Sequence, residues 1–410
     1  MKSTVAFILC VASVSGSLMA QGGAIVLRGA TIYPVGSAPI ENGTLVIEGG
    51  KITAIGDSQT PAPADARAIV CDADWVITPG LIDAGTSLSI SAKNSNEQAK
   101  EVTPHMRILD AVEAGHRAFE KARNNGVTAV QINPGNANVI GGLGAVVKTW
   151  GGTTQEMLIK DASALRVTLG REPGTGNSRS GTQHNIYYRR PSTRMGTIWE
   201  VRKAFYDAMS YRDQKTIPGD AGPPPIDPGK EVLLQVLDGT LTVHTTARGE
   251  EDIRTALRIA DEFGYRTVIQ GGIEIWQVID QVVDAQATVI FAPPSLNGAN
   301  PDGAEGRSHT MNMMAERGVP FAIQTDSSLG ERSLAHEAMV AMRNGLSFDK
   351  ALASVTLVPA QVLGINDTVG TLEPGKNADL VVWSGAPFDP TSSALMVFID
   401  GNQVVGPKTN

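Results

Sequence analysis

Residues 253–291 read IRTALRIADEFGYRTVIQGGIEIWQVIDQVVDAQATVIF, and this stretch decides the fold class. Apolar residues recur at helical spacing until Gly264 ends the first helix: Ile253, Ala256, Leu257, Ala260 and Phe263. An apolar strand follows over 266–269, then a helix over 275–283 and a strand over 288–291. Strands that alternate with helices in this way are typical of a parallel sheet covered by helices.

The same alternation extends in both directions along the chain. A helix is predicted from Thr103-Pro104 to Asn124, followed by a buried strand over 127–132, and a later helix over 311–317 precedes a strand over 320–324. The length of this α/β region, residues 80–364, suits a closed (β/α)₈ TIM barrel. Residues 171–230, rich in glycine and proline, interrupt the alternation, and we expect this insertion to be a flap over the strand ends.

Short strands punctuated by glycine and proline occur at both ends of the chain. They predict a small β-sandwich domain assembled from residues 21–79 and 365–410, on either side of the barrel. Residues 1–20 are predicted to be a signal peptide, because Lys2 precedes an apolar run of seven residues and Ala20 ends a stretch of small residues. We therefore expect an exported protein, periplasmic or secreted.

Composition excludes several classes of partner. The 410 residues carry a formal net charge of −8, whereas nucleic-acid and anionic-membrane binders need a basic face. The apolar run near the N-terminus is too short to span a bilayer. We expect no nucleic-acid partner and no membrane span, which leaves a small-molecule ligand possible.

Two motifs give the chain a family resemblance. Residues 78–84, TPGLIDA, resemble the opening of the barrel in the amidohydrolase superfamily, the metal-dependent hydrolases related to imidazolonepropionase. Residues 370–382, GTLEPGKNADLVV, resemble the return of that superfamily's chain into its β domain. The resemblance covers nearly all of the chain after residue 20. It implies a barrel with a metal centre at the carboxyl ends of the strands.

The residues at the implied metal positions differ from the superfamily pattern. Where the first strand is implied to end in His-x-His, this chain has Gly85-Thr86-Ser87. Thr246 stands at the fifth-strand histidine, and Gln270-Gly271-Gly272 replaces Glu-His-Gly on the sixth. Only Asp326 matches, at the eighth-strand aspartate that the resemblance implies as metal ligand and proton shuttle.

Asp326 is therefore the predicted catalytic residue, and three others are predicted to bind substrate. His244 lies two residues before Thr246 and so on the same strand face. Lys148 follows an apolar run, and Arg194 in the insertion is a candidate to bind an anionic group of the substrate. No metal site is predicted, because catalytic zinc usually has three protein ligands and Asp326 with His244 supplies two.

These substitutions lead to one main hypothesis and two alternatives. The main one is a superfamily member with a degenerate metal site, a non-hydrolytic or much weakened protein that binds a ligand or a partner. That partner is an active amidohydrolase relative or a second copy, and no cofactor is expected. The alternative is an active hydrolase of non-peptide carbon–nitrogen bonds in cyclic amide, N-acyl or dipeptide-like substrates, with a rebuilt mononuclear zinc site. A structural subunit is the third reading.

Overall fold

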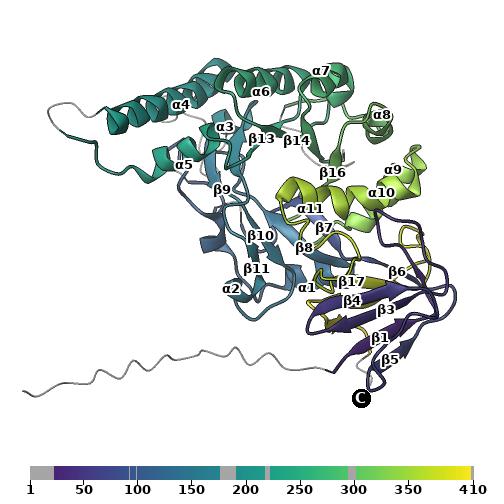
Figure 1. The fold of residues 1–410 in the computed structure, drawn as a ribbon. Coiled ribbons are helices and arrows are strands. Elements are labelled where there is room, and N and C mark those ends of the chain that lie inside the picture. Colours follow the sequence, from purple (N-terminus) through teal and green to yellow (C-terminus); the bar gives the residue numbers. More distant parts are fainter. Residues whose placement is uncertain are drawn as a thin grey trace, which may run out of the picture.

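The computed structural model describes residues 23–91, 93–97, 99–175, 191–217, 222–293 and 302–407, which form a mixed α/β structure (Figure 1). The predicted signal peptide lies outside the described residues, as does 176–190 in the predicted insertion. No helix of the described part is long and apolar enough to cross a membrane.

Two small sheets lie together at one end of the molecule (Figure 1). The first has the order β4-β3-β1-β5, from β1 (Ile25–Arg28), β3 (Thr44–Glu48), β4 (Lys51–Gly56) and β5 (Arg67–Val70). The second has the order β19-β18-β17-β6-β2, from β2 (Thr31–Ile32), β6 (Val76–Pro79), β17 (Leu380–Trp383), β18 (Ala394–Ile399) and β19 (Asn402–Val405). Leu27, Leu45, Ile77, Leu380 and Phe398 share one buried cluster. Strands from both ends of the chain thus build one β core.

The larger part of the chain contains the predicted parallel sheet. Five strands run parallel, namely β12 (Leu165–Thr168), β13 (Val243–Ala247), β14 (Thr267–Gly271), β15 (Thr288–Phe291) and β16 (Phe321–Ile323). An antiparallel strand, β9 (Ile140–Leu143), pairs with β12 at one edge. Helices α6 (Glu250–Phe263), α7 (Ile279–Asp284) and α8 (Thr310–Glu316) connect the parallel strands. The alternation predicted for 253–291 and its continuation to residue 324 are confirmed.

A second sheet lies beside this one. It has the order β11-β10-β8-β7, from β7 (Leu81–Thr86), β8 (Val127–Ile132), β10 (Ala145–Lys148) and β11 (Leu158–Lys160). Backbone hydrogen bonds join it to the segment that follows β16: the amide of Asp326 donates to the carbonyl of Gly85 (3.1 Å), and the amide of Ser87 donates to the carbonyl of Ser327 (3.0 Å). Helix α11 (Leu357–Leu363) packs Val358 and Val362 onto strands of both sheets. One closed ring of eight parallel strands stays a prediction.

The helix predicted from Thr103-Pro104 to Asn124 is wrong in its first half. The structure has a short 3₁₀ helix, η1 (Ile108–Ala111), and then α1 (Arg117–Asn124), with the His116 ring accepting the N–H of Ala118 (3.2 Å) as the N-cap. Thr103 instead donates its backbone N–H to Ile140 of β9 (2.9 Å). Pairing with a distant strand holds this segment extended and overrides its local helical pattern.

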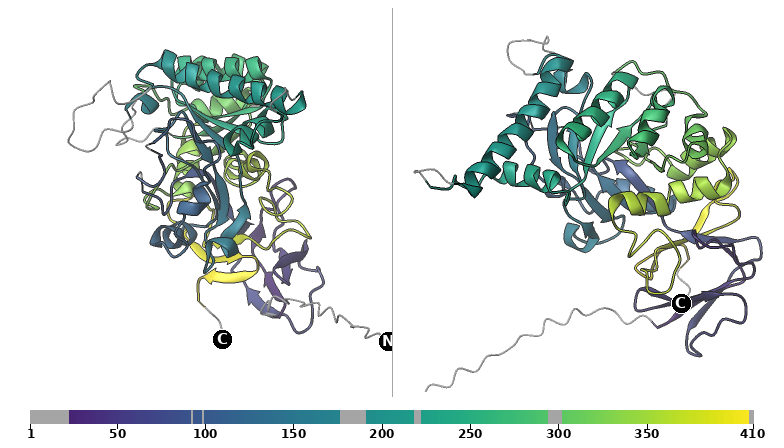
Figure 2. Two further views of the ribbon diagram at one scale, coloured as in Figure 1. Left: turned by 90° about the vertical axis from the view of Figure 1, so that its left-hand side faces the viewer. Right: turned by 45° about the horizontal axis from the view of Figure 1, so that its top comes forward.

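The predicted insertion is helical in the part described, and its role as a flap stays a prediction. It forms the single turn α3 (Glu172–Thr175), whose Glu172 lies at the strand ends, and the helices α4 (Arg194–Thr216) and α5 (Pro228–Leu237), which lie on the outer side of the molecule (Figures 1 and 2). The Phe205 ring of α4 stacks on Phe263 of α6 and on Tyr265, with centroids 5.0 and 5.2 Å apart. Helix α4 is thus an extra layer outside α6, fixed by aromatic packing.

Helices near the C-terminal end of the α/β region complete the layer around the sheets. They are α9 (Leu334–Arg343) and α10 (Phe348–Ser354), which precede α11, while the single turn α2 (Thr154–Met157) connects β10 to β11. Buried Ala338, Ala341 and Leu352 belong to the main apolar cluster of the α/β region. This layer leaves open the carboxyl ends of the parallel strands.

Candidate functional site

A cavity of about 710 Å³ opens at the carboxyl ends of strands from both large sheets. Its wall includes Thr86 at the end of β7, Asn133 after β8, Arg166 in β12, Gln270 in β14 and Asp326 after β16. In barrels and parallel sheets this end of the strands is where ligands bind. The fold thus brings polar side chains from distant parts of the chain to one cavity.

Arg166 is the centre of a hydrogen-bonded network at this cavity. It is only 5% exposed, and its guanidinium donates to Oε1 of Gln270 and to Oδ1 of Asn136 (2.6 Å). The same Asn136 oxygen accepts the hydroxyl of Thr246 (3.1 Å), and Nε2 of Gln270 donates to Oε1 of Gln324 (2.5 Å). A positive charge bound by neutral amides therefore occupies the strand ends.

This network includes two of the positions at which the chain departs from the family pattern, and it packs against a third. Thr246 and Gln270 are members of it, and the amides of Gln270 and Gln324 lie where a Cβ on Gly85 would have to be. A side chain at position 85 would force this amide pair to move, so glycine there is matched to the present arrangement of the two glutamines. Gly85, Thr246 and Gln270 thus belong to one connected arrangement, whereas Ser87 and Gly271 do not take part in it.

The donor groups of this site do not fit a zinc centre. Within the described part of the chain, no cluster of three or more His, Cys, Asp and Glu side chains is placed to hold a metal ion. Catalytic zinc takes three nitrogen, sulfur or carboxylate ligands, whereas the hydrogen-bonded network at these strand ends consists of amide groups and the Arg166 guanidinium. The wall also includes Glu113, His116, Glu172 and Asp326, but no three of them are clustered to hold a metal. The guanidinium has no lone pair to offer a metal, and its charge repels a divalent cation.

Asp326 lies at the rim of the cavity, as its predicted role requires. Its backbone has a positive φ of 52°, a conformation that Asp tolerates better than most residues, and its side chain is exposed. Within the described residues its carboxylate takes part in no hydrogen bond or ion pair. Its negative charge interacts with the Arg166 guanidinium electrostatically, without direct contact. Burial lowers the pKa of Arg166 to about 10, and the charge of Asp326 opposes that shift.

His244 does not join Asp326 on the described wall of the cavity. It faces Arg166 in the register of β12 and β13, one layer deeper than Thr246, and is 1% exposed. Both ring nitrogens lack a hydrogen-bond partner in the described structure. Burial, followed by the charge of Arg166, lowers the pKa of His244 to about 3, so the ring is neutral near pH 7.

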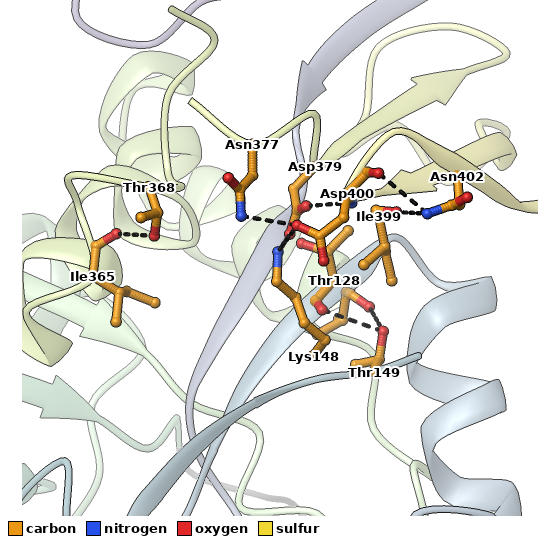
Figure 3. A network of polar contacts seen from close by, with 11 residues as sticks. Thr128, Lys148, Thr149, Ile365, Thr368, Asn377, Asp379, Ile399, Asp400 and Asn402 are labelled. Carbon is orange, nitrogen blue, oxygen red and sulfur yellow. Dashed lines mark hydrogen bonds and ion pairs between the residues drawn. The ribbon is translucent and has the colours of Figure 1, made fainter. Parts of the chain in front are cut away.

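Lys148 was predicted to bind substrate, and the structure places it elsewhere (Figure 3). Its ammonium, at the end of β10, lies 2.5 Å from Oδ2 of Asp379 and 3.1 Å from Oδ1 of Asp400. Asn377 donates to that Asp400 oxygen (2.8 Å), and the Asp400 backbone N–H donates to Asp379 (2.9 Å). Burial lowers the pKa of Lys148, but the two carboxylates outweigh it and the pKa is raised. Lys148 therefore joins β10 to the β core.

Arg194 is also separate from the cavity. At the start of α4 its guanidinium pairs with Glu251 and with Asp252 (3.1 Å), both in the first turn of α6. The predicted contact with an anionic substrate is thus replaced by contacts with two carboxylates of the chain itself. Of the four predicted site residues, only Asp326 lies on the cavity wall.

Sequence reasoning missed Arg166, which is the most distinctive residue of the site. The available signal was a single arginine inside the short apolar strand Leu165–Thr168, where a charged residue is rarely buried without a purpose. Asn136 also lines the cavity and accepts a hydrogen bond from Arg166.

Comparisons with known proteins agree with this architecture. Residues 286–406 match the family model described as "Amidohydrolase family". The crystal structure of an amidohydrolase from Thermotoga maritima MSB8 superposes with a TM-score of 0.83 at 30% identity, over 93% of this chain and 100% of that one. Imidazolonepropionase of Mesorhizobium japonicum is 25% identical over 81% of this chain and 83% of its own length. Amidohydrolase tasK of Hapsidospora irregularis is 24% identical over 85% of this chain, which spans only 38% of that protein.

The 30% identity to the Thermotoga protein extends over both the β core and the α/β region, since nearly the whole of each chain is superposed. The matched family model independently includes β15 to β19 and the helices between them. Together with the cavity at the strand ends, these similarities establish that the chain belongs to the amidohydrolase superfamily.

Proposed function

We propose that this protein binds a small ligand in the cavity at the strand ends and does not hydrolyse it by the metal-dependent chemistry of its relatives. The observation that carries the proposal is the position of Arg166, whose guanidinium and amide partners stand where the resemblance implies a metal centre. In this proposal the two large sheets form a single (β/α)₈ barrel around that network.

The chemistry of a guanidinium supports the loss of hydrolysis. Zinc lowers the pKa of its bound water from 15.7 to about 7 and so supplies hydroxide at neutral pH. A guanidinium attracts an oxygen atom electrostatically but binds no water as a Lewis acid. Asp326 alone remains to activate water, and a lone carboxylate is a weak general base for unassisted water.

The test is elemental analysis combined with an activity panel on the purified full chain. We expect far less than about one equivalent of zinc or manganese per chain. We also expect no hydrolysis of cyclic amides, N-acyl amino acids or dipeptides when either metal is added. Tightly bound metal together with a metal-dependent activity that Asp326→Ala abolishes would contradict the proposal and support an active hydrolase with a rebuilt site.

A further inference from the structure

Helix α4 has two apolar faces, and only one of them is buried in the described structure. The buried face belongs to the main apolar cluster and includes Val201, Ala204, Phe205, Ala208 and Tyr211. It packs against α6 through the Phe205 ring and against α5 through a hydrogen bond from Tyr211 to Glu231 (2.7 Å). A surface helix normally has one apolar face and a polar face opposite it, so a second apolar face on α4 needs a second partner.

The second face is a line of large side chains that stay exposed. Met195, Trp199 and Tyr206 are 79%, 57% and 47% exposed, and Ile217, directly after the helix, is 80% exposed. At 3.6 residues per turn these four positions fall within about 40° of one another, along about 33 Å of helix and opposite the buried face. Figures 1 and 2 show α4 on the outer side of the molecule. We call this line the outer stripe; a continuous apolar line of this kind marks an interaction surface.

The middle of the outer stripe is fixed in place by contacts within the chain. Arg202 donates to Oε2 of Glu262 in α6 through Nε (2.9 Å) and Nη2 (2.7 Å), and the Tyr206 hydroxyl donates to the same carboxylate (3.0 Å). The Tyr206 ring also packs edge-on against Phe263, with centroids 5.2 Å apart. Side chains that are already ordered lose little conformational entropy when a partner binds, which favours association.

The charges beside the outer stripe indicate that its partner is a second α4. Lys203 and Asp207 pair along one edge of the stripe (2.5 Å), close to its midpoint at residue 206. In a two-fold arrangement with antiparallel helices the same edge of both copies meets, so Lys203 of each copy faces Asp207 of the other. A parallel pair would place Lys203 against Lys203. A lipid surface fits less well, because helices that bind membranes carry an excess of basic residues beside the apolar face.

We propose that two copies of this chain associate through the outer stripe, with the two α4 helices antiparallel about a two-fold axis near Tyr206. In this dimer Met195 of one copy meets Ile217 of the other. The inference goes beyond the proposed function and does not depend on it, because no residue of α4 is on the described wall of the cavity.

Sedimentation velocity of the full chain between about 1 and 100 µM tests the association. We expect a reversible equilibrium in which the dimer predominates at the upper concentrations. Trp199→Glu should weaken the dimer at least about tenfold, because it buries a charge in the stripe. The matched control is Val70→Glu, at a residue of β5 that is 79% exposed, and it should leave the dimer unchanged. A chain that stays monomeric, whether or not it binds anionic lipid vesicles, or a dimer unaffected by Trp199→Glu, would overturn the inference.

Charge reversal tests which residues face each other in the dimer. Lys203→Asp gathers carboxylates of both copies at one contact and should weaken the dimer at least about tenfold. Asp207→Lys added to the same chain restores opposite charges across the contact, and the affinity should return to within about threefold of the original. If this double variant folds but does not recover the dimer, the antiparallel register is refuted.

Engineered cysteines test the orientation of the two helices. A chain that carries both Met195→Cys and Ile217→Cys should form disulfide-linked dimers when diamide is added, because these positions meet between copies but lie about 33 Å apart within one chain. Met195→Cys alone should not crosslink. The unsubstituted chain measures the background from Cys10 and the buried Cys71. Crosslinking of Met195→Cys alone, or none in the double variant, would contradict the antiparallel packing.

Discussion

Replacement of Lys148 by methionine should strongly destabilise the fold. The Lys148 ammonium is the partner of Asp379, and the two residues are only 4% and 3% exposed (Figure 3). Methionine has a similar length but leaves the Asp379 carboxylate buried without a counter-charge. Removing one partner of a buried ion pair costs about 3–5 kcal/mol, and we expect the free energy of unfolding to fall by that amount.

A double variant separates the contribution of the ion pair to stability from the contribution of the packing around it. Lys148→Met with Asp379→Asn removes both charges and keeps an amide oxygen to accept the Asp400 backbone N–H. We expect most of the loss to be recovered, leaving a deficit below about 2 kcal/mol. The matched control is Lys203→Met, whose exposed pair with Asp207 on α4 should contribute no more than about 0.5 kcal/mol.

Urea unfolding followed by circular dichroism at pH 7 measures these differences. A loss below about 1 kcal/mol in Lys148→Met would refute the reasoning that the buried pair holds β10 against the β core.

Three further predictions concern residues around the strand ends. Burial raises the pKa of Asp83 to about 6 despite hydrogen bonds from Thr325, so between about pH 4 and 6 the folded state keeps a proton that the unfolded chain has lost. The free energy of unfolding should therefore fall by about 3 kcal/mol as pH rises over that range. Urea titrations at several pH values should show that the free energy of unfolding depends less on pH in Asp83→Asn. His244 should change the free energy of unfolding in the opposite direction, because its lowered pKa means that only the unfolded chain gains a proton as pH falls from about 6.5 toward 3, and stability is lost over that range. His244→Leu should reduce this loss at low pH and cost less than about 1.5 kcal/mol at pH 7. An unchanged dependence of stability on acid pH would contradict the buried neutral ring. Gly85→His should lower stability by at least about 2 kcal/mol without creating a zinc site, because its Cβ meets the amides of Gln270 and Gln324; a stable variant with stoichiometric zinc would disprove this.

Local signals in the sequence predicted the elements that depend on local structure. The stripe ending at Gly264 becomes α6, and Gly264 adopts the left-handed conformation (φ 69°) that ends many helices. The strand predicted at 266–269 appears as Thr267–Gly271. Hydrophobic periodicity and a glycine stop are properties of neighbouring residues, so they are readable without the tertiary structure.

Contacts between distant residues explain the predictions that differ from the structure. Thr103 is held by Ile140, and the carboxylates that bind Lys148 are 231 and 252 residues away in the chain. No spacing rule connects such positions. For the same reason the sequence identified Asp326 by its motif, while Arg166 became recognisable only when its amide partners were placed around it.

The substitutions at the strand ends depend on one another, and this dependence explains the character of the site. Gly85 leaves room for the Gln270 amide, Gln270 accepts from Arg166, and Gln324 completes the pair. A histidine introduced at one of these positions would leave the other side chains in place, so a single substitution would not rebuild a metal centre. A guanidinium and a divalent metal both attract an anionic oxygen, but only the metal makes hydroxide from bound water. Under the function proposed above, exchange of a metal for the Arg166 guanidinium keeps the attraction for a ligand and removes the means to cleave it.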